Sequence, residues 1–202
     1  VGNVMIDSLV QLLPRAAASG ILGQLGLRPG SFAAVTLHRP SNVDDPARLA
    51  LIMGELARLA ADLPVVFPLH PRTRKMLSAS GAGAPPAGLR LIDPLGYLDF
   101  LRLQSEASVV ITDSGGVQEE TTFLGIPFLT VRANTERPIT IEQGTNRLID
   151  PAREPLREAA LLAAASRPAR PPAIEYWDGR TAGRVVEAVK GLWSKAEAGD
   201  AS

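Results

Sequence analysis

The sequence contains no cysteine, and that absence excludes several kinds of chemistry. A chain without cysteine has no disulfide bonds, no thiolate nucleophile and no cysteine-ligated zinc. The 202 residues include two histidines, His38 and His70, which are too few for most histidine-based metal sites. We therefore expect a protein without a metal site and without a metal cofactor.

Aromatic residues are also scarce, and the charges cancel. Phe, Trp and Tyr together make up 4% of the chain, so a stacking surface for single-stranded nucleic acid is not expected. The 21 basic and 21 acidic residues give a net charge of zero, which does not indicate a nucleic-acid partner. No run of about 18 apolar residues is present, so we expect no transmembrane helix and no membrane partner.

The chain lacks the common signals for secretion and for several nucleotide sites. Its first residues have no basic segment followed by an apolar one, so we expect a cytoplasmic protein. Residue 1 is valine, not methionine, which suggests that the chain belongs to a longer gene product. There is no P-loop and no Gly-x-Ser-x-Gly elbow, and the Gly-Gly pair at 115–116 is not the Gly-x-Gly-x-x-Gly of NAD-binding proteins.

What the chain does contain is a regular alternation of strand-like and helix-like segments. An apolar content of 46% over this length is enough for one domain with a full core. Runs of buried-strand character lie at 32–37, 64–69, 89–92, 108–112, 127–131 and 146–149. Helical spacing is found at 3–18, 46–61, 71–79, 97–106, 115–124, 153–166 and 179–195.

This alternation predicts an α/β fold with a doubly wound, mostly parallel six-stranded sheet of the Rossmann type. We expect residues 1–202 to form a single domain, with a leading helix within 1–20 and a closing helix within 173–195. The apolar side chains of that last helix are expected to pack against the domain. The Gly/Ala/Pro segment 81–88 is expected to be a mobile loop, and the tail after residue 195 to be frayed.

Polar side chains gather directly after four of the predicted strands. Because ligands of such sheets bind at the carboxyl ends of the strands, these clusters should converge on one edge. The clusters lie at 38–42, 70–72, 113–120 and 132–137.

The cluster at 113–120 reads Asp-Ser-Gly-Gly-Val-Gln-Glu-Glu and opens a predicted helix. Unpaired N–H groups at a positive helix end suit a phosphate, with Ser114, Gly115 and Gly116 nearest to it. Glu120, one turn into the helix, can accept hydrogen bonds from sugar hydroxyls. The alternative is an ordinary capped helix, in which the Ser114 side chain is the N-cap.

The other clusters also leave two interpretations open. His38 and Arg39 can hold a phosphate or move a proton, or His38 is simply satisfied by main-chain groups, with Asn42 capping the following loop. His70 precedes Pro71, which can start a helix, so a capping or packing histidine is favoured there. Tyr97 can lean on a base or pack at the rim.

The segment 132–138 offers two guanidinium groups, Arg132 and Arg137, that can clamp a phosphate. Thr135 can instead cap a helix that runs from residue 136 to residue 143 and ends at Gly144.

Together these segments resemble the UDP-N-acetylglucosamine 2-epimerase family along almost the whole chain. The octet 113–120, followed by Asn134-Thr135-Glu136-Arg137-Pro138, is the most specific part. The further matching pieces are Gly2-Asn3 with Ile6-Asp7, Thr36-Leu37-His38-Arg39 with Asn42, Pro68-Leu69-His70-Pro71, Pro94-Leu95 with Tyr97, Gly125-Ile126-Pro127, Arg132, Glu142 with Gly144-Thr145-Asn146, and Trp177-Asp178-Gly179.

The resemblance implies the C-terminal, UDP-binding half of a GT-B fold, with the ligand in a cleft toward an N-terminal domain that this chain does not include. In that family Ser114, Gly115 and Gly116 would hold the diphosphate, with Arg137 and Tyr97 also at the UDP site, and Glu120 would hold the ribose. His38 would lie near the phosphates and the reacting sugar as a catalytic residue. Arg39 and His70 match positions that help to bind a second, regulatory UDP-sugar.

The reaction implied by the family inverts C2 of the sugar and interconverts UDP-GlcNAc and UDP-ManNAc, through elimination and re-addition of UDP, without an external cofactor. The carboxylates for proton abstraction lie in the N-terminal domain. The family's usual His-Arg-Arg-Glu-Asn is replaced here by His38-Arg39-Pro40-Ser41-Asn42. The alternatives are a nucleotide-sugar-binding module or half of a split enzyme, and a GT-B glycosyltransferase donor domain. A homodimer is left open.

Overall fold

One six-stranded sheet organises the protein. The computed structural model describes residues 1–79 and 84–199. All neighbouring strands run parallel in the order β3-β2-β1-β4-β5-β6, so the predicted doubly wound α/β sheet is confirmed. The strands are β1 (Ala33–Thr36), β2 (Val65–Pro68), β3 (Leu89–Ile92), β4 (Val109–Thr112), β5 (Phe128–Val131) and β6 (Asn146–Ile149).

Helices cover both faces of the sheet, and the core is therefore split into two layers. On one face, α4 (Pro46–Leu59), α5 (Pro71–Ala79) and α9 (Leu156–Ala165) pack against side chains such as Val35 and Ile111. The neighbouring strand positions point to the opposite face, where α6 (Tyr97–Glu106) and α7 (Gly115–Leu124) pack. The four residues of β2, β4 and β5 are all buried, which is why these strands read as continuous apolar runs.

The first helix forms an outer layer on the second face. In α1 (Val4–Ala17), Ile6 and Leu9 are completely buried against Leu101 of α6, with Phe123 of α7 beside them. This packing brings the start of α1 close to the start of α7, since the side chain of Met5 lies next to Gly116.

The strand order creates one special position, between β1 and β4. The chain passes outward from this pair in opposite directions, toward β2 and β3 on one side and toward β5 and β6 on the other. Crossover helices therefore leave a crevice at the carboxyl ends of β1 and β4, and this is where open parallel sheets bind their ligands.

Three short helices differ from the sequence-based expectation. Two that the sequence did not predict are α2 (Ile21–Gln24) and α3 (Pro40–Val43). The third is α8 (Ile139–Glu142), which is shorter than the predicted helix 136–143 and has Pro138, not Thr135, at its N-cap. Each spans about one turn, so apolar periodicity cannot reveal it. Residues 81–83 of the expected mobile loop lie outside the described residues.

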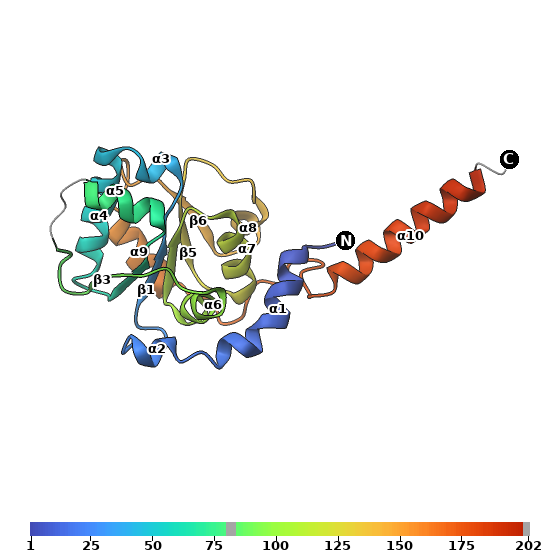
Figure 1. Ribbon diagram of the computed structural model, residues 1–202, viewed down its shortest axis with the longest axis horizontal. Coiled ribbons are helices and arrows are strands. Elements are labelled where there is room, and N and C mark those ends of the chain that lie inside the picture. The colour runs from blue at the N-terminus through green and yellow to red at the C-terminus, as the bar shows by residue number, and fades with distance from the viewer. Residues whose placement is uncertain (80–83, 200–202) are drawn as a thin grey trace.

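The last helix is longer than predicted and does not pack as predicted. Figure 1 shows α10 (Thr181–Gly199) running away from the sheet and its covering helices. Its apolar side chains are exposed, so the expectation that they pack against this domain is wrong. They are Val185, Val186, Val189, Leu192 and Trp193, between 41% and 69% exposed. Trp177, before the helix, does pack onto the α1 layer.

The junction between α1 and α10 depends on the buried carboxylate of Asp7. Its oxygens accept hydrogen bonds from the main-chain N–H groups of Thr181 (3.0 Å) and Ala182 (2.6 Å), the first residues of α10. Gly2 lies at the same junction with φ of +108°, and a Cβ there would meet the Tyr176 carbonyl oxygen at 2.4 Å. Asp7 thus caps one helix from inside another, 174 residues away in sequence.

Asp7 should make the junction sensitive to acid. Burial acts to raise the pKa of this carboxyl group, but the hydrogen bonds from Ala182 and Thr181 outweigh it, so the pKa is lowered in the folded protein. A lowered folded-state pKa stabilises the fold above the unfolded-state pKa, and this stabilisation is lost as the pH falls through the folded-state value. We expect Asp7→Asn to lower the melting temperature by a few degrees at pH 7 and by less at pH 3.

Thermal unfolding at the two pH values measures this difference. Asp93→Asn is the matched control, because the side chain of Asp93 is 90% exposed. A deficit of Asp7→Asn that stayed the same at pH 3, or that grew, would contradict the assignment of Asp7 as a charged cap.

Candidate functional site

The candidate site begins with a buried carboxylate at the crevice between β1 and β4. Asp113 follows β4 and is completely buried. Its oxygens accept hydrogen bonds from the main-chain N–H groups of His38 (3.1 Å) and Arg39 (2.9 Å), which follow β1. The side-chain amide of Asn42 donates a further hydrogen bond to the same carboxylate (3.1 Å). One carboxylate therefore holds the whole turn after β1 against the end of β4.

Two side chains of this turn strengthen the same connection. The Arg39 Nε donates to the main-chain oxygen of Asp113 at 2.8 Å, and the Asn42 amide also donates to the Val131 oxygen at the end of β5, at 2.9 Å. The His38 Nδ1 lies 3.3 Å from the Asp113 carboxylate. The expectation that Asn42 merely caps its own loop is wrong, because it joins three strand ends.

The start of α7 does not behave as an ordinary capped helix. Ser114 has the extended backbone of an N-cap residue, but its side chain makes no capping hydrogen bond, and its own N–H donates to the Thr112 hydroxyl at 3.0 Å. The first N–H groups of an α-helix have no partner within the helix. The first turn of α7 thus lacks the side-chain cap that the alternative interpretation requires.

The two glycines leave the space in front of this helix end open. A Cβ atom at Gly115 would have no neighbour within 4 Å, and one at Gly116 would meet only the flexible end of Met5, at 2.9 Å. Neither glycine has a positive φ. Packing and backbone strain within the described chain therefore do not require glycine at position 115, whereas the close approach of a ligand would.

Glu120 is buried one turn further into α7. Its two oxygens accept hydrogen bonds from the Tyr97 hydroxyl (2.8 Å) and from the Gln104 amide (2.6 Å). Burial raises the pKa of Glu120, the nearby charge of Glu119 adds to this, and the two hydrogen bonds act in the opposite direction. Burial and Glu120 likewise raise the pKa of the Tyr97 phenol. A carboxylate oxygen can accept more than one hydrogen bond, so Glu120 retains acceptor capacity.

The two predicted guanidinium groups have different surroundings. Arg132 forms two hydrogen bonds of 2.7 Å with Glu136, which lower the pKa of that carboxyl group to about 2. The Arg137 Nε lies 2.6 Å from a carboxylate oxygen of Glu119 on α7, and its side chain remains 40% exposed. The loop thus brings Arg137 beside the helix that carries Ser114 and Glu120, whereas Arg132 pairs with Glu136 in its own loop.

The two histidines lie at the carboxyl ends of β1 and β2, with ring centroids 5.5 Å apart. The His70 Nδ1 accepts a hydrogen bond from the Arg72 N–H (3.2 Å) at the start of α5, so His70 has the capping contact that the sequence favoured. Beside it lies a hollow of about 160 Å³, whose lining includes Leu95 and Phe100. The regulatory role of Arg39 and His70 stays a prediction.

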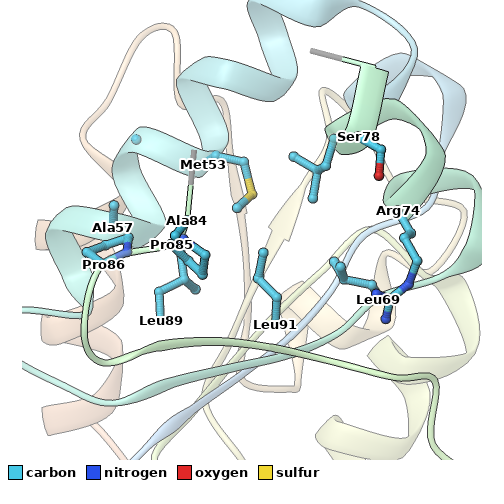
Figure 2. Close-up of a pocket in the computed structure, with 12 residues that line it drawn as sticks. Met53, Ala57, Leu69, Arg74, Ser78, Ala84, Pro85, Pro86, Leu89 and Leu91 are labelled. Atoms are coloured by element: carbon cyan, nitrogen blue, oxygen red, sulfur yellow. The ribbon is translucent and has the colours of Figure 1, made fainter. Parts of the chain in front are cut away.

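A larger hollow lies between α4, α5 and β3, and its lining is mostly apolar. Figure 2 shows this hollow of about 430 Å³, with Met53, Leu89 and Leu91 pointing into it. Its charged residue, Arg74, donates to Asp93 and to the Ile92 main-chain oxygen. The polar groups at the carboxyl ends of β1 and β4 are therefore the better candidate site.

In 1–79 and 84–199, no three side chains of His, Asp or Glu gather in a way that could hold a metal ion. Within the same ranges, no helix is long and apolar enough to span a lipid bilayer.

The geometry includes residues that sequence reasoning missed. Asp113 belongs to the octet, yet it received no role, and Gln104 and Phe100 received none either. The signal for Asp113 was present, since a carboxylate directly after a fully apolar strand must find partners. Those partners lie 71 to 75 residues earlier in the chain, where no local pattern points to them.

Comparison with known proteins gives a consistent result. The family profile described as UDP-N-acetylglucosamine 2-epimerase matches residues 1–190. The UDP-2,3-diacetamido-2,3-dideoxy-D-glucuronate 2-epimerase of Pseudomonas aeruginosa is 40% identical over 162 residues, which are 79% of this chain and 44% of that protein. The UDP-N-acetylglucosamine 2-epimerase of Methanocaldococcus jannaschii is 36% identical over 168 residues, 79% of this chain and 46% of that protein.

Solved structures agree with the sequence comparison. The crystal structure of the Methanocaldococcus jannaschii UDP-GlcNAc 2-epimerase in complex with UDP-GlcNAc and UDP superposes with a TM-score of 0.78 and 32% identity, over 93% of this chain and 54% of that chain. The enzyme from Neisseria meningitidis bound to UDP-GlcNAc has a TM-score of 0.76 and 28% identity, over 94% and 54%. The present chain thus spans about half the length of these relatives.

The central role of Asp113 leads to a stability prediction. Asp113→Asn keeps the size of the side chain but places an amide NH₂ where N–H donors already point. We expect a loss of about 2–4 kcal/mol of unfolding free energy, measured by denaturant titration. Asp45→Asn is the control, because Asp45 caps α4 through the Ala47 N–H and asparagine caps equally well. Equal losses in the two variants would contradict the role of Asp113.

Proposed function

Because the chain belongs to the UDP-N-acetylglucosamine 2-epimerase family, we propose that its β1–β4 crevice binds the UDP part of a UDP-sugar. We propose further that the full-length protein is an isomerase that interconverts UDP-GlcNAc and UDP-ManNAc. The observation that carries this proposal is the open, glycine-lined start of α7, where a missing Cβ at Gly115 leaves room that the protein itself does not use.

The diphosphate is assigned to the start of α7. The N–H groups of Gly115 and Gly116 and the hydroxyl of Ser114 supply donors at the positive end of the helix, which favours an anion. Arg137 supplies a guanidinium group, which is planar and pairs with two phosphate oxygens at once. Three neutral donor groups and one cation are thereby directed at the same anion.

The nucleoside is assigned to the region between α7 and the start of α6, where Glu120 and Tyr97 lie. Glu120 is buried, negatively charged when ionised, and retains acceptor capacity for the two hydroxyls of a ribose. Tyr97, a residue that is 43% exposed, donates its hydroxyl hydrogen bond to Glu120. The hollow lined by His70 and Phe100 is assigned to the base.

The chemistry assigned to this half is the stabilisation of the leaving UDP. In the elimination step a base removes the C2 proton, the electron pair forms the C1–C2 double bond, and the C1–O bond breaks with its electrons going to UDP. The α7 amides and Arg137 stabilise the charge that develops on the departing diphosphate. His38, at the end of β1, is assigned to the phosphates and the reacting sugar, and re-addition delivers the proton to the opposite face of C2.

An N-terminal half is the proposed partner for the exposed face of α10. Val185, Val189 and Leu192 are spaced by four and three residues and so share one side of the helix. An exposed apolar stripe of this kind usually marks an interface. The relatives are about twice as long as this chain, and their additional half is the simplest occupant. A cytoplasmic location follows from the same proposal, because UDP-sugars are made there.

The names of the relatives supply a second candidate for the sugar. The relative with 40% identity is named for a diacetamido-glucuronate and the one with 36% for N-acetylglucosamine, and both names specify UDP and C2. The UDP-binding residues argued above do not distinguish the two sugars. Assays of the full-length protein with both substrates would decide between them. Transfer of the sugar to an acceptor would instead support a glycosyltransferase.

Binding of UDP to the 202-residue chain tests the site. We expect Gly115→Ala to weaken UDP binding by roughly tenfold or more, measured by calorimetry, because the new methyl group enters the space assigned to the diphosphate. The melting temperature should not fall, since no protein atom lies near that methyl group. Gly54→Ala, in the middle of α4 and equally free of neighbours, is the control. Unchanged UDP affinity in Gly115→Ala would contradict the site.

Turnover of UDP-GlcNAc tests the proposal that this chain binds UDP and that the N-terminal half removes the C2 proton. The 202-residue chain alone should bind UDP but not epimerise UDP-GlcNAc, because the proton-abstracting carboxylates are assigned to the other half. Mixing or co-expressing it with the N-terminal half of the full-length protein should produce activity, detected by chromatography of UDP-GlcNAc and UDP-ManNAc. Activity of the isolated chain would contradict this division.

A further inference from the structure

Arg137 lies in a segment without regular structure, so something other than a helix or strand must fix its position. The segment runs from residue 132 to residue 138, between β5 and α8. The Arg137 N–H donates to the Thr135 hydroxyl at 3.0 Å, and the Arg137 carbonyl accepts from the Thr140 hydroxyl at 2.7 Å. Both main-chain groups of Arg137 are thus held by threonine side chains.

The first of these threonines is anchored to α7 by Gln118. The Thr135 hydroxyl donates to the Gln118 Oε1 at 2.6 Å. Gln118 is completely buried and comes two residues after Gly116. Because α7 is a rigid element packed against the sheet, this bond ties the irregular segment to the helix whose start is assigned to the diphosphate.

The second threonine is anchored through Asn146 at the start of β6. The Asn146 amide donates to the Thr140 hydroxyl at 2.9 Å and to the Gln118 Oε1 at 3.3 Å, and its own oxygen accepts from the Thr130 hydroxyl at 2.7 Å. The bonds from Arg137 through Thr135 and through Thr140 therefore meet at a single atom, the oxygen of Gln118.

The side chain of Arg137 is held by the residue next to Gln118. Glu119 is 6% exposed, and one of its oxygens lies 2.6 Å from the Arg137 Nε. Its other oxygen is buried without a hydrogen-bond partner, as is the Nε2 of Gln118. The Gln118 Oε1 is the acceptor for both Thr135 and Asn146, so an apolar residue at position 118 would leave these two donors without it. The amide oxygen of Gln118 therefore joins the segment 132–138 to α7 and to the start of β6.

We propose that Gln118 is a positioning residue, which acts through Thr135 and Asn146 to hold Arg137 where its guanidinium group meets the diphosphate. This inference rests on the proposed function, because it takes the diphosphate site at α7 as given. In this proposal Gln118 acts through Arg137 and not by its own contact with the ligand. Its effect is confined to the contact made by Arg137, and so to the phosphates and not to the nucleoside.

Two substitutions remove the anchor in different ways. Gln118→Met keeps the length of the side chain and removes the acceptor. Thr135→Val keeps the shape of the side chain and removes the hydroxyl, while Thr135→Ser keeps the hydroxyl and is the matched control. We expect Gln118→Met and Thr135→Val each to weaken UDP binding by about three- to tenfold, and Thr135→Ser to stay near the wild type.

Two further measurements distinguish a misplaced Arg137 from a general disruption of the UDP site. One uses uridine as the ligand, and the other uses the Arg137→Ala background. Binding of uridine, measured by the same calorimetry, should be unchanged in Gln118→Met, because uridine has no phosphate for Arg137 to meet. In the Arg137→Ala background, Gln118→Met should weaken UDP binding no further, since the residue through which it acts is absent.

Each contrary result has a distinct meaning. Equal losses for UDP and uridine, or a full additional loss in the Arg137→Ala background, would overturn the positioning role. Unchanged UDP affinity in both Gln118→Met and Thr135→Val would overturn it too. If the wild-type chain binds no UDP, the proposed function fails and this inference fails with it. If Gln118→Met does not fold, the comparison of Thr135→Val with Thr135→Ser decides.

Discussion

The site depends on one buried charge. A carboxylate with no exposed surface is stable only if donors surround it, and Asp113 obtains them from the turn after the neighbouring strand. That requirement fixes the turn at 38–42 against the end of β4. It also sets the direction in which Ser114 leaves the strand and α7 begins. The open helix end is therefore a consequence of how one charge is satisfied.

From there, α7 organises the rest of the site through successive residues. Gly115 and Gly116 leave its first turn uncovered, Gln118 and Glu119 hold the main chain and the side chain of Arg137, and Glu120 meets Tyr97 and Gln104. Consecutive positions on a helix point about 100° apart, so a short run of polar residues can contact several neighbouring elements. The density of polar residues in this helix, which would be unfavourable in an ordinary core helix, has a physical reason here.

Much of the fold could be predicted from the sequence, because its cause is local. Apolar runs such as 108–112 and helical spacing such as 46–61 can be recognised within one element, and their alternation implies parallel strands. The short helices α2 and α3 could not be found in this way, since one turn carries too little periodicity. The apolar stripe of α10 was visible, but what covers it depends on the surroundings, and the packing expected for it was wrong.

The candidate site was predictable in part for the same reason. Ser114 and Glu120 stand out because a glycine pair follows a buried strand, whereas the contacts that position them join residues far apart in the chain. Asn42 reaches Asp113 across 71 positions, and nothing near Asn42 in sequence indicates it. A crystal structure of the chain with UDP is the most direct test of the account. It should show diphosphate oxygens within about 3 Å of the Gly115 and Gly116 nitrogens, with the ribose at Glu120. A diphosphate bound away from the start of α7 would contradict it.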